Sequence, residues 1–283
     1  MLTISDLYIY PIKSLGGIRL NTAILTDRGF QHDRRWMLVD AGNQFLTQRE
    51  LPQMTLLQVE LREDGLVVRH KHTGDALIVP FEPAGDACTV TVWEDTCEGR
   101  HVSPQADQWF SDQLSLPCRL VYMPEATQRK VDPNYAHGEE ITSFSDGFPL
   151  LMIGQASLDD LNSRLPEPLT MERFRPNIVF TGGTPFLEDE MAAFTIAGKD
   201  IRFLGVKPCA RCVITTVDLM TGEKGKEPLK TLSGYRRLGN KIYLGQNLLF
   251  DKIPHTGEIS VGDTLTLLQK QPPVIAGTGN RPG

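Results

Sequence analysis

The feature that most constrains the fold of this chain is a succession of short segments rich in β-branched or alternating apolar residues. In the first hundred residues these segments are TISDLYIY, IRLNTAIL, RRWMLVD, TLLQVELR, GLVVRH, ALIVPF and TVTVW, separated by Gly, Asp and Pro turns. NIVF, KDIRFLGV, CVITTV and TLTLL continue the pattern toward the C-terminus. Many short strands at such spacing are typical of barrels and sandwiches. We therefore predict a mainly β protein with a few α-helices.

Three segments between these strands predict helices. The run SPQADQWFSDQL at 103–114 has an N-cap serine, a first-turn proline and apolar residues at helical spacing. SLDDLNSRL at 157–165 begins with a Ser-x-x-Asp cap signature and repeats leucine on one face. A third, short helix is expected from Pro228 to about Arg236.

A length of 283 residues suggests about two domains. We expect a β-rich N-terminal domain at 1–95 and a larger, barrel-like domain at 96–270, followed by a tail or linker at 271–283. Residues 124–142 are polar, contain two prolines and show no period, so they predict a long surface loop of the kind often recruited into a site.

Charge and composition exclude several classes of function. Lys and Arg total 29 against 35 Asp and Glu, a formal charge of −6, which offers no general footprint for nucleic acid or an anionic membrane. A local basic pocket remains compatible with this balance. The N-terminus lacks the pattern of a signal peptide, and no apolar run approaches the ~20 residues of a membrane span. We expect a soluble, cytoplasmic protein that binds neither nucleic acid nor membrane.

Five cysteines, an odd number, argue against a disulfide framework and for reduced thiols. Cys209 and Cys212 stand three positions apart, and Lys207 and Arg211 beside them favour the thiolate form. Small buried thiols that only pack are the plainest interpretation. A reactive or metal-binding pair is the alternative.

Three functional interpretations of the pair compete. A structural zinc site needs about four ligands, and the irregular pair Cys97 and His101 is the only partner available. A thioredoxin-like dithiol should open a helix, whereas VITTV after Cys212 predicts a strand. The third possibility is one thiolate that binds a soft transition metal whose other ligands come from a cofactor. It requires an anion-binding pocket elsewhere in the chain.

Lys13 and Ser14 are candidates for that pocket. They stand between a predicted strand and the Gly16-Gly17 turn, where an ammonium, a hydroxyl and backbone N–H groups can converge on a phosphate. A solvated turn is the alternative. Taken alone, these residues favour the solvated turn.

Seven motifs together resemble a known family, and they cover nearly the whole chain. They are YPIKS at 10–14, HDRRWMLVD at 32–40, SFSDGFPLLM at 143–152, MERFRPNIVFTGG at 171–183, VKPCARCVITTVD at 206–218, EPLKTL at 227–232 and LGQNL at 244–248. In order and spacing they resemble the MOSC-domain family, which shares a domain with the C-terminus of molybdenum cofactor sulfurase and includes the mitochondrial amidoxime-reducing component and its bacterial relatives. The resemblance implies an N-terminal MOSC-type β-barrel domain and a C-terminal MOSC barrel.

The resemblance also implies a molybdenum cofactor, in which the dithiolene of a pterin holds the metal and Cys212 is the protein ligand. Cys209 is then a neighbouring thiol that shapes the pocket. Lys13, Ser14 and Arg34 are implied to bind the phosphate side of the pterin, although Arg34 has an exposed ion pair with Asp33 as its alternative. The remaining implied pocket residues are Ser145, Asp146, Arg175, Asn177, Arg211, Gln246 and Asn247, of which Ser145 and Asp146 also fit an ordinary turn. Pyridoxal phosphate binding accompanies the family as a general term.

The implied activity is reduction of small N-hydroxylated compounds, with oxygen removed from nitrogen at reduced molybdenum and released as water. A binding module that carries the cofactor, or a sulfur atom as a persulfide, is the alternative. The sequence shows no cysteine cluster of a fused ferredoxin, so a separate ferredoxin-like or flavoprotein-like donor is expected. Gly183-Thr184 stand where the mitochondrial reductase has a Cys-Asp pair, so an acid from that position is not expected.

Overall fold

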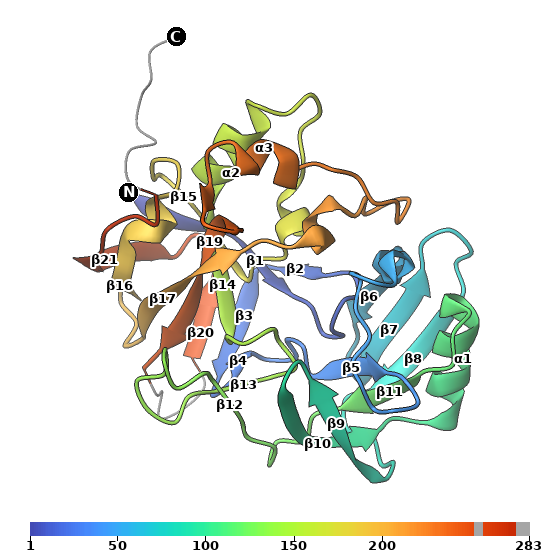
Figure 1. Ribbon diagram of the computed structural model, residues 1–283. Helices are drawn as coiled ribbons and strands as arrows, with labels where there is room; N and C mark the ends of the chain where they lie inside the picture. The colour runs from blue at the N-terminus through green and yellow to red at the C-terminus, as the bar shows by residue number, and fades with distance from the viewer. Residues whose placement is uncertain (252–256, 276–283) are drawn as a thin grey trace.

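The computed structural model describes residues 1–251 and 257–275 as a mainly β fold, which confirms the predicted class. Figure 1 shows two lobes, one holding β1 and the strands from β14 onward and the other holding β5 to β11. Three α-helices occur in the described ranges, and none is long and apolar enough to cross a membrane.

The first lobe is a closed seven-stranded barrel. Its order is β14 (Leu150–Gly154), β15 (Ile178–Thr181), β1 (Leu2–Ile9), β21 (Thr264–Lys270), β16 (Met191–Ile196), β17 (Arg202–Ala210) and β19 (Lys241–Phe250), and a β14–β19 pairing closes it. Only β14 and β15 run parallel among these pairs. Short strands β2 (Ile18–Leu20) and β18 (Arg237–Leu238) extend it, and β20 (Gly257–Ser260), β3 (Thr22–Thr26) and β4 (Gly29–Phe30) form a small sheet beside it.

The second lobe contains two small antiparallel sheets. One has the order β5 (Trp36–Val39), β11 (Arg119–Tyr122), β10 (Asp95–His101) and β9 (Ala87–Val92), and the other is β6 (Leu57–Leu61), β7 (Gly65–His70) and β8 (Ala76–Pro80). The helix α1 (Pro104–Leu114) and the 3₁₀ turn η1 (Pro52–Leu56) complete this lobe. β10, whose sequence DTCEGRH has little β-branched character, was not predicted.

The two lobes are not separated by a single boundary in the sequence. β1 belongs to the barrel, although it stands at the start of the region expected to form the N-terminal domain. The boundary near residue 95 stays a prediction. Of the expected tail, residues 276–283 lie outside the described residues, and Gln271 donates its backbone N–H to the Glu190 carbonyl at 2.9 Å.

All three predicted helices are present, and the bounds of two of them differ from the prediction. α1 begins after Ser103, whose Oγ accepts the Ala106 N–H at 3.1 Å, as its sequence predicts. α2 (Gln155–Asn162) starts two residues earlier than expected, with Gly154 as N-cap, so Ser157 is not the cap. The buried Ser157 Oγ instead donates to Glu188 Oε2 at 2.8 Å. The third helix, α3 (Leu229–Ser233), is shorter than predicted.

Two other segments differ from their predictions. The residues after Cys212 form the 3₁₀ turn η4 (Val213–Thr216) rather than a strand, because the Thr215 N–H turns back to the Cys212 carbonyl at 3.1 Å. The expected loop 124–142 contains a short antiparallel pairing of β12 (Arg129–Lys130) with β13 (Ile141–Thr142), which is at the end of that range. Two further 3₁₀ turns, η2 (Met171–Phe174) and η3 (Leu187–Glu190), flank β15.

Buried arginines fix the segment that links the lobes. Arg28 donates to the carbonyls of Glu125 and Thr127 at 2.8 and 3.0 Å. Arg35 donates to the Met123 carbonyl and to Glu125 Oε1. Because each guanidinium presents several N–H groups in a rigid fork, these contacts satisfy carbonyls that no strand partner reaches.

The carboxyl of Glu188 makes a stability prediction possible. It is fully buried, and burial raises its pKa from 4.5 to about 7 despite the Ser157 hydrogen bond. The folded chain therefore keeps this proton to about pH 7, whereas the unfolded chain releases it near pH 4.5. This contribution to stability is complete below pH 4.5 and is lost as pH rises through 7.

We therefore expect Glu188→Gln to raise the free energy of unfolding at pH 8.5 by about 1 to 3 kcal/mol relative to the parent protein, and by much less at pH 5. Urea unfolding at both pH values measures the difference. Glu63→Gln, at an exposed position, is the matched control and should change neither value. An equal effect of Glu188→Gln at both pH values would contradict this account.

Candidate functional site

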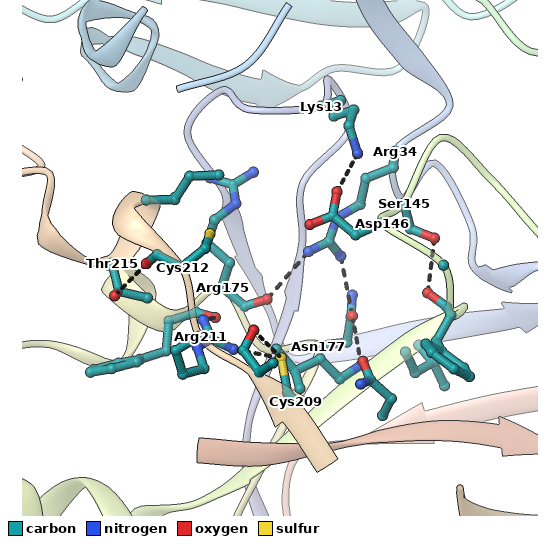
Figure 2. Close-up of a pocket in the computed structure, with 18 of the residues that line it drawn as sticks. Lys13, Arg34, Ser145, Asp146, Arg175, Asn177, Cys209, Arg211, Cys212 and Thr215 are labelled. Atoms are coloured by element: carbon teal, nitrogen blue, oxygen red, sulfur yellow. Dashed lines mark hydrogen bonds and ion pairs between the residues drawn. The ribbon is translucent and has the colours of Figure 1, made fainter. Parts of the chain in front are cut away.

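A cavity of about 430 Å³ lies where the two lobes meet. Residues from the loop after β1, from the second lobe, from the 145–148 loop and from β17 and η4 all line it. Figure 2 shows Lys13 and Arg34 on one side and Cys212 with Thr215 on another. Ten of the eleven predicted site residues line this cavity: Lys13, Ser14, Arg34, Ser145, Asp146, Arg175, Asn177, Arg211, Cys212 and Asn247.

Gln246 is the predicted residue that does not line the cavity. Its side chain is fully buried, and a Cβ placed on Gly205 would lie 3.0 Å from its Nε2. Neighbouring residues of a strand point to opposite faces, and Asn247 reaches the cavity while donating to the Lys207 carbonyl at 3.1 Å. The assignment of Gln246 to the cavity wall was therefore wrong.

Arg34 joins its own segment to the distant segment 175–177 at the base of the cavity. Its Nη1 donates to Asp33 Oδ2 at 2.5 Å and to Asn177 Oδ1 at 3.1 Å, and its Nη2 donates to the Arg175 carbonyl at 3.2 Å. Asp33 is buried, not exposed as the simple ion-pair alternative requires. Asn177 also accepts the Leu151 N–H at 3.1 Å, so its amide is fixed from both sides.

The cavity wall carries six cationic side chains and one carboxylate. Two of the cations, Arg34 and Arg175, lie 4.3 and 4.2 Å from the ring centre of Tyr10. Burial, and then the charge of Arg34, lowers the pKa of Arg175 to about 10. In a chain with a net charge of −6, this concentration of positive charge makes the cavity electrostatically favourable for an anion.

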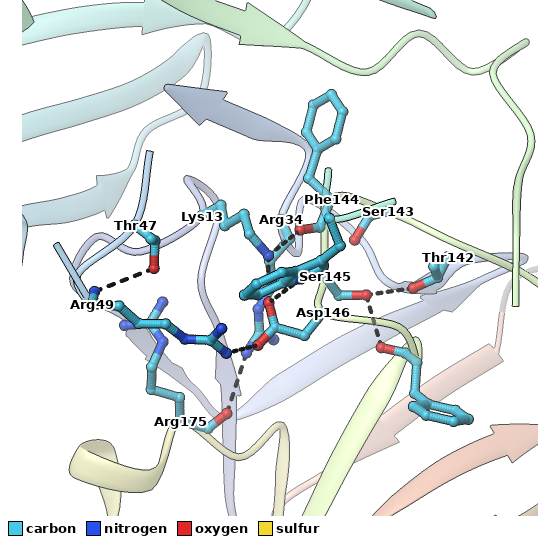
Figure 3. Close-up of polar contacts among 12 residues, drawn as sticks. Lys13, Arg34, Thr47, Arg49, Thr142, Ser143, Phe144, Ser145, Asp146 and Arg175 are labelled. Carbon is cyan, nitrogen blue, oxygen red and sulfur yellow. Dashed lines mark hydrogen bonds and ion pairs between the residues drawn. The ribbon is translucent and has the colours of Figure 1, made fainter. Parts of the chain in front are cut away.

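Lys13 and Asp146 form the ion pair at the centre of Figure 3. Lys13 Nζ donates to Asp146 Oδ1 at 2.6 Å and to the Phe144 carbonyl at 2.8 Å. Burial lowers the pKa of Lys13 to about 8, even though Asp146 opposes the shift. Burial alone would raise the pKa of Asp146, but Lys13, then Arg49, holds it well below its usual range.

Three residues of the wall have backbone conformations that their side chains disfavour. Ser14, Arg34 and Arg175 have φ of 67°, 50° and 56°, in the left-handed region. Such residues persist when surrounding contacts impose them, and they concentrate at functional sites. Here the Arg34 N–H donates to the Tyr10 carbonyl at 3.0 Å and the Arg175 N–H to the Glu172 carbonyl at 3.1 Å.

The two cysteines of the wall differ in their contacts. Arg211 Nη1 donates to Cys209 Sγ at 3.0 Å, yet burial raises the pKa of the Cys209 thiol. The Cys212 sulfur makes no hydrogen bond to any described residue. The part of the chain that the structure describes holds no cluster of three or more His, Cys, Asp or Glu that could hold a metal ion.

The sequence analysis missed part of the wall. Thr47, Arg49 and Trp93 come from the second lobe, and Lys207 comes from β17. Arg49 lies 4.1 Å above the Trp93 ring and 3.8 Å from Asp146. No local pattern marks the three second-lobe residues, because only the packing of the lobes brings them to the cavity. Lys207 was noted solely as a neighbour of the cysteines.

These features define a class of protein. It is mainly β and has two lobes, and the cavity between the lobes is rich in cations and carries a C-x-x-C pair. A family model described as the MOSC N-terminal beta barrel domain matches residues 1–117, and one described as the MOSC domain matches residues 139–266. Together with the relatives below, these matches show that the chain belongs to the MOSC-domain family.

The chain is 34% identical to mitochondrial amidoxime-reducing component 1 of Homo sapiens, over 94% of its own length and 83% of that protein. It is 33% identical to the Mus musculus protein of the same name, over 94% and 82% of the two chains. It also matches molybdenum cofactor sulfurase of Arabidopsis thaliana at 29% identity, over 88% of this chain and 33% of the sulfurase.

The loop that carries Ser145 and Asp146 depends on a buried arginine outside the predicted set. Arg129 Nη1 donates to the carbonyls of Ser143 and Ser145 at 2.9 and 2.6 Å, and Nε donates to Asp95 Oδ2 at 2.8 Å. The same loop supplies the carbonyl of Phe144 to Lys13. Arg129 therefore positions the loop, although it does not line the cavity.

We expect Arg129→Met to destabilise the fold by about 2 kcal/mol, because two buried carbonyls lose their donors. Hydrogen exchange should show faster opening at 143–148 than in the parent protein. Arg164→Met removes an exposed arginine that follows the end of α2 and pairs with Asp160, and should leave exchange in this loop unchanged. Unchanged exchange at 143–148 in Arg129→Met would show that the loop is held by other contacts.

Proposed function

We propose that this protein is a molybdenum-cofactor-dependent oxidoreductase that reduces N-hydroxylated compounds, with Cys212 as the protein ligand of the metal. The observation that carries the proposal is the Cys212 sulfur, which has no hydrogen-bond partner among the described residues and lies on the wall of a cavity rich in cations. Relatives named for amidoxime reduction and for the molybdenum cofactor support it.

The residues present fit such a cofactor. A pterin phosphate needs several N–H donors, and Lys13, Ser14 and Arg34 provide an ammonium, a hydroxyl and a guanidinium along one wall. The buried Nε atoms of Arg49 and Arg211 have no acceptor among the described residues, so the wall has donors to spare. A thiolate is the soft ligand that suits molybdenum when the cofactor supplies the other sulfurs.

Each group of residues has a task in this proposal. Lys13, Ser14 and Arg34 hold the phosphate, while Arg175 and Asn177 line the pterin. Cys212 binds the metal and Arg211 keeps the neighbouring Cys209 in place at 3.0 Å. The bound molybdenum cofactor supplies the change in oxidation state that removal of oxygen from nitrogen needs.

The overall reaction consumes two electrons and two protons. The N–O bond of an N-hydroxylated compound breaks, nitrogen gains a hydrogen, and the oxygen leaves as water. We propose that a separate electron-donor protein, ferredoxin-like or flavoprotein-like, supplies the electrons. The test is turnover of a hydroxylamine by the molybdenum-loaded protein with a chemical donor, and no turnover at full metal content would end the catalytic proposal.

A carrier of the cofactor, or of a sulfur atom as a persulfide, is the second candidate. The Arg211 guanidinium at Cys209 favours it, because a positive charge would stabilise a persulfide anion there. In a carrier, mass spectrometry should show added sulfur on Cys209 or Cys212 without bound metal.

Replacing the two cysteines separates the candidates. We expect Cys212→Ala to lose nearly all bound molybdenum, because the other thiol of the wall, Cys209, accepts a hydrogen bond from Arg211 and burial raises its pKa, and we expect Cys209→Ala to keep most of it. Elemental analysis and pterin fluorescence of protein from a host that makes the cofactor measure both. Equal retention by the two variants would remove Cys212 as the ligand.

The pKa of Lys13 predicts how anion binding depends on pH. Because this pKa is lowered to about 8, the ammonium loses its charge as pH rises past 8, and attraction for an anion falls with it. We expect the affinity of the cofactor-free protein for sulfate to drop up to about tenfold between pH 7 and 9.5. Calorimetric titration measures the drop. Lys13→Met should bind more weakly at pH 7 and show a flatter profile, and a profile as steep as the parent's would exclude Lys13 as the cause.

A further inference from the structure

Lys207 differs from the other five cations of the cavity wall. Each of the others has an oxygen partner. Four donate hydrogen bonds, Lys13 to Asp146, Arg34 to Asp33, Arg175 to the Leu15 carbonyl and Arg211 to the Phe174 carbonyl, and Arg49 forms an ion pair with Asp146 at 3.8 Å. Lys207 Nζ makes no hydrogen bond or ion pair with any residue in the described ranges. An ammonium has three N–H donors and no acceptor, so this group is left to bind an anion.

Aromatic rings hold Lys207 at the cavity. Its Nζ lies 4.2 Å from the ring centre of Tyr135 and 5.6 Å from that of Phe148, and these two rings meet edge to face at 5.6 Å. The faces of aromatic rings attract a cation without using its N–H groups. The side chain is therefore partly ordered and partly desolvated while its donors stay free, which is the state that favours binding of an incoming anion.

Lys207 lies on the strand that leads to Cys212, the proposed metal ligand, and not on the segments that carry the proposed phosphate-binding residues. It belongs to β17, which leads directly to Cys209 and Cys212, and it pairs in register with Asn247 of β19. Lys13 and Ser14 follow β1 and Arg34 follows β4, and Figure 2 shows Lys13 and Arg34 on the other side of the cavity from Cys212. A substrate must reach the metal, so a free cation on the Cys212 wall is placed for the substrate.

We propose that Lys207 binds the carboxylate of the substrate, and that the substrate is a flat, conjugated N-hydroxylated compound whose ring packs against Phe148. This inference rests on the proposed function for the N-hydroxyl group and on Lys207 for the carboxylate. Phe148 lines the cavity beside Lys207, so one compound contacts both. The shared chemistry is an anionic oxygen, which the cofactor's phosphate also has.

The test compares two probes, 4-carboxybenzamidoxime and benzamidoxime, which differ by one carboxylate. Calorimetric titration of the molybdenum-loaded protein without an electron donor measures binding apart from turnover. We expect the carboxylated probe to bind about tenfold more tightly to the parent protein, and this ratio to fall to about one in Lys207→Met. Lys207→Gln repeats the measurement should the first variant fold poorly, and Lys207→Arg should keep most of the preference.

Lys241→Met is the matched control, since Lys241 is an exposed lysine at the start of β19 and does not line the cavity. It should keep the tenfold ratio. An unchanged ratio in both Lys207→Met and Lys207→Gln would overturn the proposal. So would a parent protein that binds the two probes equally.

Two further measurements are needed. The first distinguishes the substrate's carboxylate from the cofactor's phosphate as the anion that Lys207 binds, and the second tests the proposed reductase activity separately from the Lys207 site. Loss of molybdenum and pterin from Lys207→Met, with full retention in Lys241→Met, would assign Lys207 to the cofactor's phosphate and overturn the substrate role. Addition of a chemical electron donor then tests turnover. A parent protein that prefers the carboxylated probe but reduces neither compound would end the reductase proposal while the Lys207 site stands.

Discussion

The contacts of the Arg34 guanidinium are the interaction on which the cavity depends. Two guanidiniums, Arg34 and Arg175, lie within 4.3 Å of one Tyr10 ring, and their charges repel each other. Asp33, itself buried, offsets one charge, and the carbonyl of Arg175 and the amide of Asn177 accept N–H groups from Arg34. The segment after β1, the segment after β4 and the segment after η2 are thereby tied to one another. Without these acceptors the positive charge could not be buried there.

Much of this cavity was predicted because seven motifs, in order and spacing, resemble the MOSC-domain family; taken alone, Lys13 and Ser14 favoured a solvated turn. YPIKS follows the alternating pattern of β1, and FRPN precedes the apolar run of β15. What could not be predicted depends on tertiary packing. Arg49 and Trp93 reach the cavity from another lobe, and irregular register in β17 near Lys207 and Pro208 decides that Asn247, and not Gln246, faces it. The sequence motif LGQNL gives no reason to distinguish Gln246 from Asn247, although neighbouring residues of a strand point to opposite faces of the sheet.

Local propensity also misled where the site imposes its own backbone. VITTV is a strong strand sequence, yet after Cys212 it turns into η4, because the Cys212 carbonyl accepts both the N–H and the hydroxyl of Thr215. That turn leaves the Cys212 sulfur just beyond the end of β17, without a hydrogen bond to any described residue. Ser14, Arg34 and Arg175 take left-handed conformations that their residue types disfavour. These departures from local preference concentrate at the cavity, as expected where function rather than stability selects the geometry.

The cations of the wall divide into two kinds according to where their N–H groups go. Arg34, Arg175 and Arg211 use part of their donors on backbone carbonyls, so each is held in one orientation and presents a fixed remainder to the cavity. A guanidinium suits this double use, because some of its N–H groups can donate hydrogen bonds to the protein while the others donate to a ligand. Lys207 has no such anchor, and aromatic faces order it without consuming a donor. A resident group that stays bound benefits from the first arrangement, since the site is already formed. A ligand that must enter and leave benefits from the second, because an ammonium on a flexible stem follows it and releases it without breaking a bond to the protein.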